Sequence, residues 1–263
     1  MQTVRLASRL TLFVLFLLLT ALIALWAGAL EKLKGTKLDR TRRARFCFNG
    51  AARCLGLRIR REGRIAEAPV LFVSNHVSWS DIPVLGGLAP LRFLSKAEVR
   101  GWPFIGWLAG QAGTLFIQRG GGRSGQSREE IALALEQRQS VLIFPEGTTT
   151  DGSDVRPFHQ RLLYAAAMAD VMIQPVSIGY HRQGKPDHLA PFVGDDDFRS
   201  HLLRLLRQPA AEVSVVFHPS VPVARGTDMA SLTNHLHETV AAGVRRIHWG
   251  GADSISSSVA SLT

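Results

Sequence analysis

An uncharged apolar segment near the start of the chain limits what this sequence can fold into. Residues 10–30 are 21 consecutive residues without a charge, long enough as a helix to cross a bilayer core of about 30 Å. The small residues at 27–29 fit a signal-peptide cleavage site, but a signal peptide has a shorter apolar core of about 7–15 residues. Residues 38–57 show amphipathic helical spacing with an arginine-rich face, which is typical of a helix in the membrane interface. We therefore expect residues 1–64 to form membrane-anchoring helices, with spanning and interfacial arrangements both open.

The positive charge of the chain is concentrated beside that segment. The formal net charge is +10 for 263 residues, yet residues 1–65 hold 14 Lys and Arg against 3 acids, and the remainder holds 17 against 18. A basic belt of this kind attracts an anionic leaflet at about 1 kcal/mol per Lys or Arg. A nucleic-acid footprint would instead need basic residues across the folded domain. We expect an anionic membrane and no nucleic acid as partner, with the domain on the cytoplasmic side of the inner membrane.

After residue 64, short apolar runs alternate with helical patterns. Strands are expected at residues 69–74, 91–94, 114–118, 141–144, 171–180 and 212–218, and helices at 81–88, 103–112, 127–138, 160–169 and 227–247. This alternation predicts an α/β domain over residues 65–250, with a largely parallel sheet flanked by helices. Residues 251–263 are expected to form a disordered tail. The chain has no phosphate-binding glycine motif and no metal-ligand spacing, so we expect neither cofactor nor metal.

Three polar clusters follow predicted strands, where ligands bind in parallel α/β sheets. The first contains His76 and Asp81, the second ends in Arg119, and the third contains Glu146. A histidine with an ordinary pKa of about 6.5 can act as a general base near neutral pH if a partner fixes its tautomer. Asp81 can be that partner if it lies in the first helical turn and its carboxylate reaches back.

Each cluster alone also has a plain structural interpretation, as a turn or a solvated side chain. The functional hypothesis depends on the three recurring at one edge of the sheet. The chain has no nucleophilic serine elbow of the Gly-x-Ser-x-Gly type. The histidine is therefore expected to activate a hydroxyl group of a substrate rather than one of the protein.

The clusters resemble the motifs of the glycerolipid acyltransferase family, whose bacterial type member is 1-acylglycerol-3-phosphate acyltransferase. The motif N-H-x-S-x-x-D is matched by Asn75, His76, Ser78 and Asp81. The motif G-x-x-F-I-x-R is matched by Gly113, Phe116, Ile117 and Arg119. The motif F-P-E-G-T is matched by Phe144, Pro145, Glu146, Gly147 and Thr148. A fourth motif is matched loosely around Pro175, and all four occur in order over residues 65–220.

The resemblance implies a role for each matched position. His76 would deprotonate the free hydroxyl of a lyso-lipid with Asp81 orienting it, and the hydroxyl would attack the thioester of acyl-CoA or acyl carrier protein directly. Arg119 would hold the phosphate of the acceptor, which suits a bidentate guanidinium. The other implied substrate-binding residues are Glu146 and Gly147 at the glycerol end of the acceptor, and Thr148, Lys96, Gly113 and Phe116.

The third motif departs from the family members that use lysophosphatidic acid, which read F-P-E-G-T-R-S. Here Thr149 and Thr150 replace the arginine and serine, and Asp151 adds a negative charge. This pattern is similar to the lyso-ornithine-lipid acyltransferases of the family, which acylate a zwitterionic lipid without phosphate. We expect acyl transfer to 1-acylglycerol-3-phosphate, giving phosphatidic acid. The alternatives are acyl transfer to lyso-ornithine lipid, thioester hydrolysis, or a non-enzymatic lipid-binding scaffold anchored in the membrane.

Overall fold

The structure is a computed structural model that describes residues 1–36, 38, 40–117 and 124–249. The helices are α1 (Gln2–Lys34), α2 (Thr41–Cys54), α3 (Asp81–Leu88), α4 (Ile105–Gln111), α5 (Ser124–Glu136), α6 (Tyr164–Ala169), α7 (Phe198–Arg207) and α8 (Met229–Trp249), with short 3-10 helices at Ala97–Gly101 and Gln160–Leu162. The strands are β1 (Leu57–Glu62), β2 (Val70–Ser74), β3 (Leu91–Lys96), β4 (Leu115–Ile117), β5 (Ser140–Ile143), β6 (Met172–Arg182), β7 (Lys185–Pro186) and β8 (Ala211–Phe217).

The strands form one eight-stranded sheet in the order β1-β8-β6-β2-β5-β3-β4, with β7 paired to β6. The neighbours from β6 to β4 are all parallel. At the other edge β8 runs antiparallel to β6, and β1 runs parallel to β8. The predicted α/β class is confirmed, and the sheet is mixed because the last strand returns beside β6 from the opposite direction.

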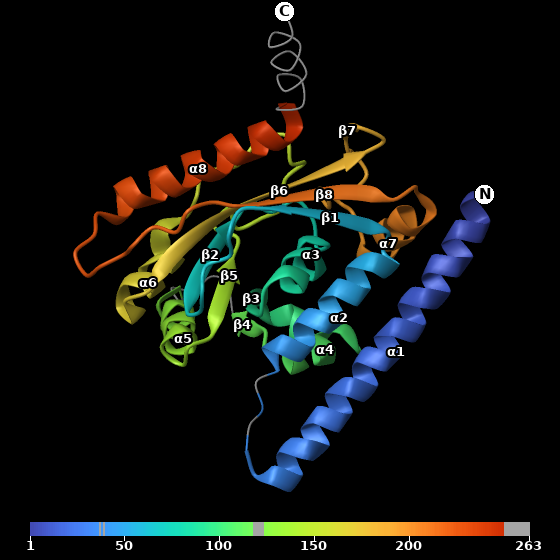
Figure 1. The fold of residues 1–263 in the computed structure, drawn as a ribbon, viewed down its shortest axis with the longest axis horizontal. Coiled ribbons are helices and arrows are strands. Elements are labelled where there is room, and N and C mark those ends of the chain that lie inside the picture. The colour runs from blue at the N-terminus through green and yellow to red at the C-terminus, as the bar shows by residue number, and fades with distance from the viewer. Residues whose placement is uncertain (37, 39, 118–123, 250–263) are drawn as a thin grey trace, which may run out of the picture.

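Helices cover both faces of the sheet (Figure 1). Because successive side chains of a strand point to opposite faces, β2 contributes to two cores. Phe72 packs in the core that includes residues of α1, α2, α3 and α7. Leu71 and Val73 pack in the core that includes residues of α5, α6 and α8. All five residues of β2 are buried, which explains why its sequence reads as an unbroken apolar run.

The sequence did not predict β1 or α7. β1 is an edge strand whose outer residues are arginines and a glutamate, and only Leu57 is fully buried, so its sequence resembles the basic flank of the apolar segment. The structure pairs β1 with β8 from Leu57 to Glu62. The sheet therefore reaches into residues 1–64, which we expected to form membrane-anchoring helices with a basic flank. The expected tail at residues 251–263 lies outside the described residues.

Helix α1 is docked on the rest of the protein. The guanidinium groups of Arg5 and Arg9 donate hydrogen bonds to the carbonyl oxygens of Arg207 and Gln208 at 3.1 and 2.7 Å, where α7 ends. A helix C-terminus carries unpaired carbonyl groups and partial negative charge, so it favours these cations. Phe13 is 6% exposed and belongs to the core.

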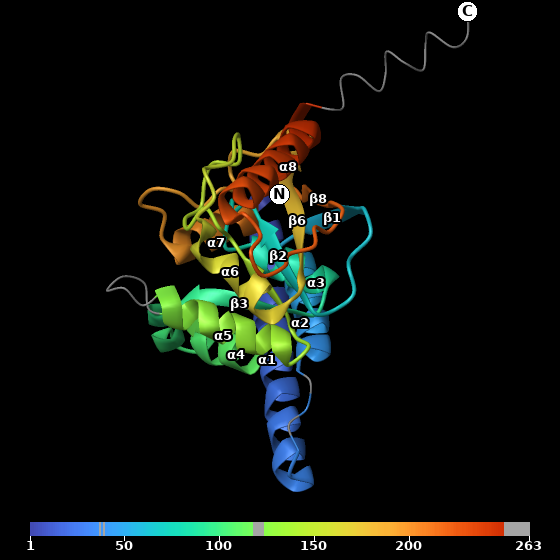
Figure 2. The ribbon, with the colours of Figure 1, turned by 90° about the vertical axis from the view of Figure 1, so that its left-hand side faces the viewer.

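The opposite face of α1 is apolar and exposed. Among the described residues, α1 is the one helix that is long and apolar enough to cross a membrane by length and composition. A stripe at helical spacing is 44–64% exposed and comprises Leu12, Leu15, Leu19, Leu22 and Trp26. The end of α1 and the start of α2 project from the body (Figure 2). Apolar surfaces of this extent typically mark a contact with lipid or another protein.

We predict that the double substitution Leu15→Glu/Leu22→Glu weakens binding to anionic lipid vesicles, and that each of the two substitutions contributes a factor of at least about ten. Each leucine contributes about 1.5–3 kcal/mol when it leaves water. Neither side chain belongs to either core, so the folded domain should remain. Leu133→Glu is the matched control, because Leu133 is 55% exposed on α5, away from the stripe. Vesicle co-sedimentation provides the measurement, and equal binding of the two proteins would contradict a lipid contact along α1.

Candidate active site

The predicted site residues follow strands that end at one edge of the sheet. β2, β5, β3 and β4 are parallel neighbours, so their carboxyl ends share that edge. His76 lies two residues after β2, and Glu146 lies three residues after β5. Arg119, the residue expected to hold the acceptor phosphate, lies outside the described residues.

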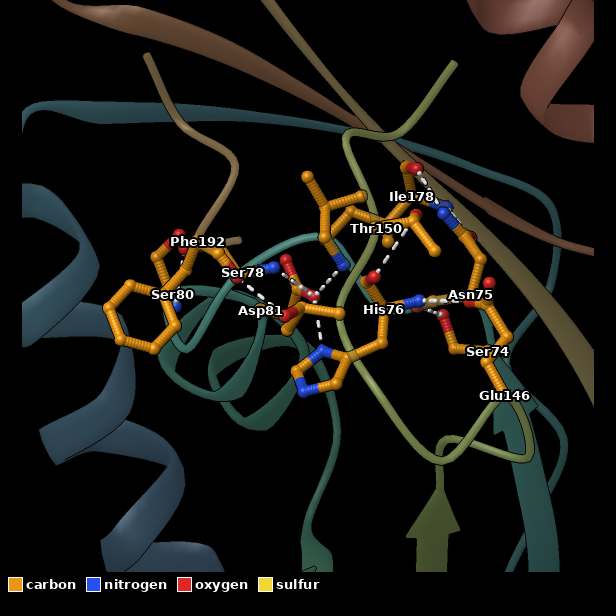
Figure 3. Close-up of polar contacts among 12 residues, drawn as sticks. Ser74, Asn75, His76, Ser78, Ser80, Asp81, Glu146, Thr150, Ile178 and Phe192 are labelled. Carbon is orange, nitrogen blue, oxygen red and sulfur yellow. Dashed lines mark hydrogen bonds and ion pairs between the residues drawn. The ribbon is translucent and has the colours of Figure 1, made fainter. Parts of the chain in front are cut away.

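The expected contact between His76 and Asp81 is present (Figure 3). The imidazole Nδ1 of His76 lies 2.8 Å from Oδ2 of Asp81. The same carboxylate oxygen accepts the backbone N–H groups of Val77 at 2.8 Å and Ser78 at 3.0 Å. Asp81 is the first residue of α3, and its carboxylate turns back over the preceding turn. Because an ionised carboxylate oxygen only accepts hydrogen bonds, the neutral form of His76 that fits this contact has its proton on Nδ1 and its lone pair on Nε2.

The other oxygen of Asp81 binds a residue from a distant strand. The hydroxyl of Tyr180, on β6, donates to Oδ1 of Asp81 at 2.6 Å. Asp81 has no exposed surface and Tyr180 is 2% exposed. Burial and the adjacent Asp81 charge raise the pKa of Tyr180 well above its ordinary value, so the phenol keeps the proton that it donates.

Glu146 holds the backbone on which His76 is carried. It is 4% exposed, and its two oxygens accept the backbone N–H groups of His76 at 2.7 Å and Arg156 at 2.8 Å. Burial raises the pKa of Glu146, although these two hydrogen bonds act in the opposite direction. We expected Glu146 to contact the glycerol end of an acceptor, but in the structure its carboxylate is engaged with the protein backbone.

The ring of His76 is held by stacking, and its reactive edge remains accessible. The ring lies parallel to Phe144 with centroids 3.8 Å apart and an interplanar angle of 9°. The backbone carbonyl of His76 accepts the N–H of Thr150 at 2.8 Å. The side chain of His76 is 18% exposed, and Nε2 points away from Asp81 (Figure 3). The imidazole is therefore partly accessible, with Nε2 on the side away from the carboxylate.

The remaining predicted residues differ in position and exposure. Lys96 is exposed at the end of β3, and Thr148 is exposed beside Gly147. Gly147 and Gly113 have φ values of +73° and +82°, a conformation that favours glycine. The carbonyl of Gly113 accepts the Nε–H of Arg92 at 2.6 Å, and Phe116 on β4 lies 4.9 Å beneath the guanidinium of Arg100. Gly113 thus precedes β4 and Phe116 lies within it, and both contact an arginine.

Sequence reasoning did not assign roles to several residues that complete the site. The side-chain amide of Asn75 exchanges two hydrogen bonds of 2.9 Å with the backbone of Ile178 on β6. From the sequence, Tyr180 is identified only as the last residue of the strand expected at residues 171–180. A tyrosine within an apolar strand was itself a signal, because a buried phenol normally has a hydrogen-bond partner. The identity of that partner required the tertiary structure.

An apolar cavity of about 320 Å³ lies on the helical side of the site. Its lining includes residues of α1, α2, α3, α4 and β3, together with Phe192 before α7 and Phe198 at the start of α7. The apolar lining residues include Phe13, Leu17, Phe48, Trp79, Ile82 and Phe198. Trp79 and Ile82 lie within two residues of Asp81 in the sequence, so part of the cavity lining comes from the segment that carries the His76–Asp81 pair. Its size and lining suit part of a lipid chain.

Comparison with known proteins agrees with this arrangement. A sequence model described as Acyltransferase matches residues 56–179. The chain is 46% identical to a lyso-ornithine lipid O-acyltransferase of Pseudomonas aeruginosa, covering 83% of this chain and 85% of that protein. It is 37% identical to the Brucella abortus protein of the same name, covering 75% and 79%. A 1-acyl-sn-glycerol-3-phosphate acyltransferase of Neisseria gonorrhoeae is 28% identical, covering 74% and 76%.

A solved structure supports the fold. The crystal structure of the 1-acyl-sn-glycerophosphate acyltransferase of Thermotoga maritima matches with a TM-score of 0.64 over 94% of this chain and 98% of that chain, at 22% identity. The sequence relatives define its membership more closely. The chain belongs to the glycerolipid acyltransferase family, in the subgroup similar to lyso-ornithine lipid O-acyltransferases.

Proposed function

We propose that the protein is a membrane-bound O-acyltransferase that transfers a fatty acyl group from a thioester donor to the free hydroxyl of lyso-ornithine lipid. The observation that carries the proposed chemistry is the His76–Asp81 pair, in which Nδ1 lies 2.8 Å from the carboxylate and the imidazole side chain is 18% exposed. The acceptor is proposed from the relatives, because the proteins with 46% and 37% identity carry that name. Acyl transfer to 1-acylglycerol-3-phosphate, our expectation from the motifs, becomes the second candidate.

In the proposed reaction His76 acts as a general base. Nε2 accepts the proton of the acceptor hydroxyl while the oxygen attacks the thioester carbonyl, and Asp81 stabilises the imidazolium that forms. The tetrahedral intermediate collapses by breaking the carbon–sulfur bond. The imidazolium then returns its proton to the leaving thiolate, so the products are the ester and a free thiol, and His76 is again neutral. In this proposal the donor is a co-substrate and no cofactor takes part.

The apolar cavity supports a site for a lipid chain. It lies between the N-terminal helices and the domain and borders Trp79, three residues from His76. A chain in this cavity would place its polar end beside the catalytic pair. The donor, either acyl-CoA or acyl carrier protein, would approach from water, with the stripe on α1 in the inner membrane and the domain on its cytoplasmic side.

The charge of the loop after β5 favours a zwitterionic acceptor. Thr149 and Thr150 carry no positive charge for a phosphate, and Asp151 is exposed one residue beyond the backbone contact with His76. Hydrogen bonds from Ser153 lower the pKa of Asp151, so its carboxylate is ionised at neutral pH. An ionised carboxylate in this loop is suited to the ammonium group of ornithine and opposes a phosphate.

The proposed acceptor is tested by comparing two lyso-lipids with one acyl donor. We predict release of free thiol and formation of the diacyl product with lyso-ornithine lipid, and at least about tenfold lower kcat/KM with lysophosphatidic acid, which corresponds to about 1.4 kcal/mol of transition-state discrimination. Thiol release without acceptor measures hydrolysis. A higher kcat/KM with lysophosphatidic acid would favour acyl transfer to 1-acylglycerol-3-phosphate. Release of free thiol at the same rate without an acceptor would indicate a hydrolase.

We predict that His76→Ala lowers kcat by about 10²–10⁴-fold, the usual contribution of general base catalysis. Asp81→Asn should also remove most activity, because the amide cannot support the imidazolium. Vesicle binding of both variants should equal that of the wild type. His235→Ala is the control, because His235 is exposed on α8. If His76→Ala retained wild-type turnover, His76 would not be the base. If the protein were a non-enzymatic scaffold, the acyl composition of the lipids would be the same with every variant.

We predict that Asp151→Asn raises KM for lyso-ornithine lipid by roughly threefold to fivefold, in keeping with the modest strength of exposed ion pairs. With lysophosphatidic acid the same change should leave KM unchanged or lower it, because it removes a like charge. Asp170→Asn is the control, since Asp170 is exposed after α6 and asparagine tolerates its left-handed conformation. A rise of KM with lysophosphatidic acid would show that Asp151 does not lie beside the headgroup.

A further inference from the structure

A chain of hydroxyl groups reaches the catalytic pair from the side opposite to the imidazole. Oγ of Ser80 lies 3.0 Å from the hydroxyl oxygen of Tyr180, which in turn lies 2.6 Å from Oδ1 of Asp81. Ser80 and Asp81 have no exposed surface, and Tyr180 is 2% exposed. Water does not compete for these contacts, so each hydrogen bond acts at low local dielectric.

The direction of this chain follows from the groups themselves. An ionised carboxylate only accepts hydrogen bonds, so the single phenolic hydrogen of Tyr180 points to Asp81. The phenolic oxygen is then an acceptor, and the hydroxyl of Ser80 must donate to it. The order is Ser80 to Tyr180 to Asp81, and the first bond polarises the phenol and strengthens the second.

The two oxygens of Asp81 serve different partners. Oδ2 receives Nδ1–H of His76 and the backbone N–H groups of Val77 and Ser78. Oδ1 receives the hydroxyl of Tyr180. A donor on Oδ1 holds the carboxylate in the rotation that presents Oδ2 to His76, and it draws negative charge away from the oxygen that faces the imidazole.

The strand that carries Tyr180 also fixes the backbone before His76. The backbone N–H and carbonyl of Ile178 pair with the side chain of Asn75. Tyr180 follows two residues later on the same face of β6. One strand thus anchors both the start of the catalytic turn and the carboxylate behind it. The Acyltransferase match ends at residue 179, one residue before Tyr180.

We propose that Tyr180 is a positioning residue of the acyl-transfer site, and that with Ser80 it limits how strongly Asp81 attracts the imidazolium form of His76. The inference rests on the proposed role of His76 as the base. According to this inference, Tyr180, a core residue of β6, affects the pH at which the site becomes active. Without the phenolic hydrogen, Asp81 would hold the proton on His76 more tightly, so the base would be free only at higher pH.

The test is the pH profile of kcat/KM for Tyr180→Phe, a change that keeps the aromatic ring and removes only the hydroxyl. We expect the acid limb to move to higher pH by about 0.5–1 unit, since each unit corresponds to about 1.36 kcal/mol of differential interaction. Below the limb, kcat/KM should fall by about 3–10-fold, and above it the loss should be smaller. A residue that only fills the core would lower activity at every pH without moving the limb.

Tyr164→Phe is the matched control, because Tyr164 is the other tyrosine of the chain and is 37% exposed on α6. Its profile should coincide with that of the wild type. Ser80→Ala provides a second variant, and it should move the limb in the same direction by about 0.3 unit, because the Tyr180–Asp81 bond remains but is less polarised. If Tyr180→Phe does not fold, the pH profile of Ser80→Ala tests the inference, and an acid limb that does not move would overturn it.

A second readout does not depend on the acceptor. The full-length chain is solubilised in detergent and isotopically labelled at histidine. An NMR pH titration then gives the pH midpoint of the His76 signal, which is identified by its absence from the spectrum of His76→Ala. The midpoint should rise in Tyr180→Phe and stay unchanged in Tyr164→Phe. An unchanged or lower midpoint would overturn the inference. If the wild type acylates neither lipid yet the midpoint moves, the proposed function fails and the role of Tyr180 in setting the charge on His76 stands.

Discussion

The arrangement of the site depends on the buried carboxylate of Asp81. An ionised carboxylate without exposed surface is strongly unfavourable unless donors replace the water that it has lost. The structure supplies four, from the imidazole of His76, two backbone N–H groups and the hydroxyl of Tyr180. These donors come from the turn after β2 and from β6, so the carboxylate is satisfied only when that turn and that strand are correctly placed.

A second buried carboxylate extends this constraint to the loop after β5. Glu146 binds the backbone of His76 and of Arg156, and thereby closes the loop against the end of β2. The loop is also held by α8. Nε2 of His248 lies 3.1 Å from the carbonyl of Gly152, and Nε2 of His237 lies 3.0 Å from the carbonyl of Val155. The loop that holds the backbone of His76 is thus itself held by α8.

The site was predictable to the extent that its chemistry is local in the sequence. His76 and Asp81 lie within one strand–turn–helix unit, so their contact followed from the chain direction and from the first turn of α3. Tyr180 lies 99 residues beyond Asp81, and only the pairing of β6 beside β2 brings the two together. Glu146 was found by its motif, but its partners are backbone groups, which no side-chain pattern reveals. β1 was missed because an exposed edge strand needs few apolar residues, and its arginines matched the basic flank.

Helix α1 links the proposed chemistry to the proposed membrane contact. Its inner face packs in the core through Phe13 and lines the cavity with Leu17, and its outer face carries the exposed stripe. Acyl transfer between two amphiphiles requires the chains in an apolar volume and the reacting atoms at its polar boundary. A loosely tethered anchor would let that boundary drift relative to His76. The hydrogen bonds of Arg5 and Arg9 to the end of α7 restrict this freedom, so the exposed stripe and the cavity wall are tied to the domain that carries His76.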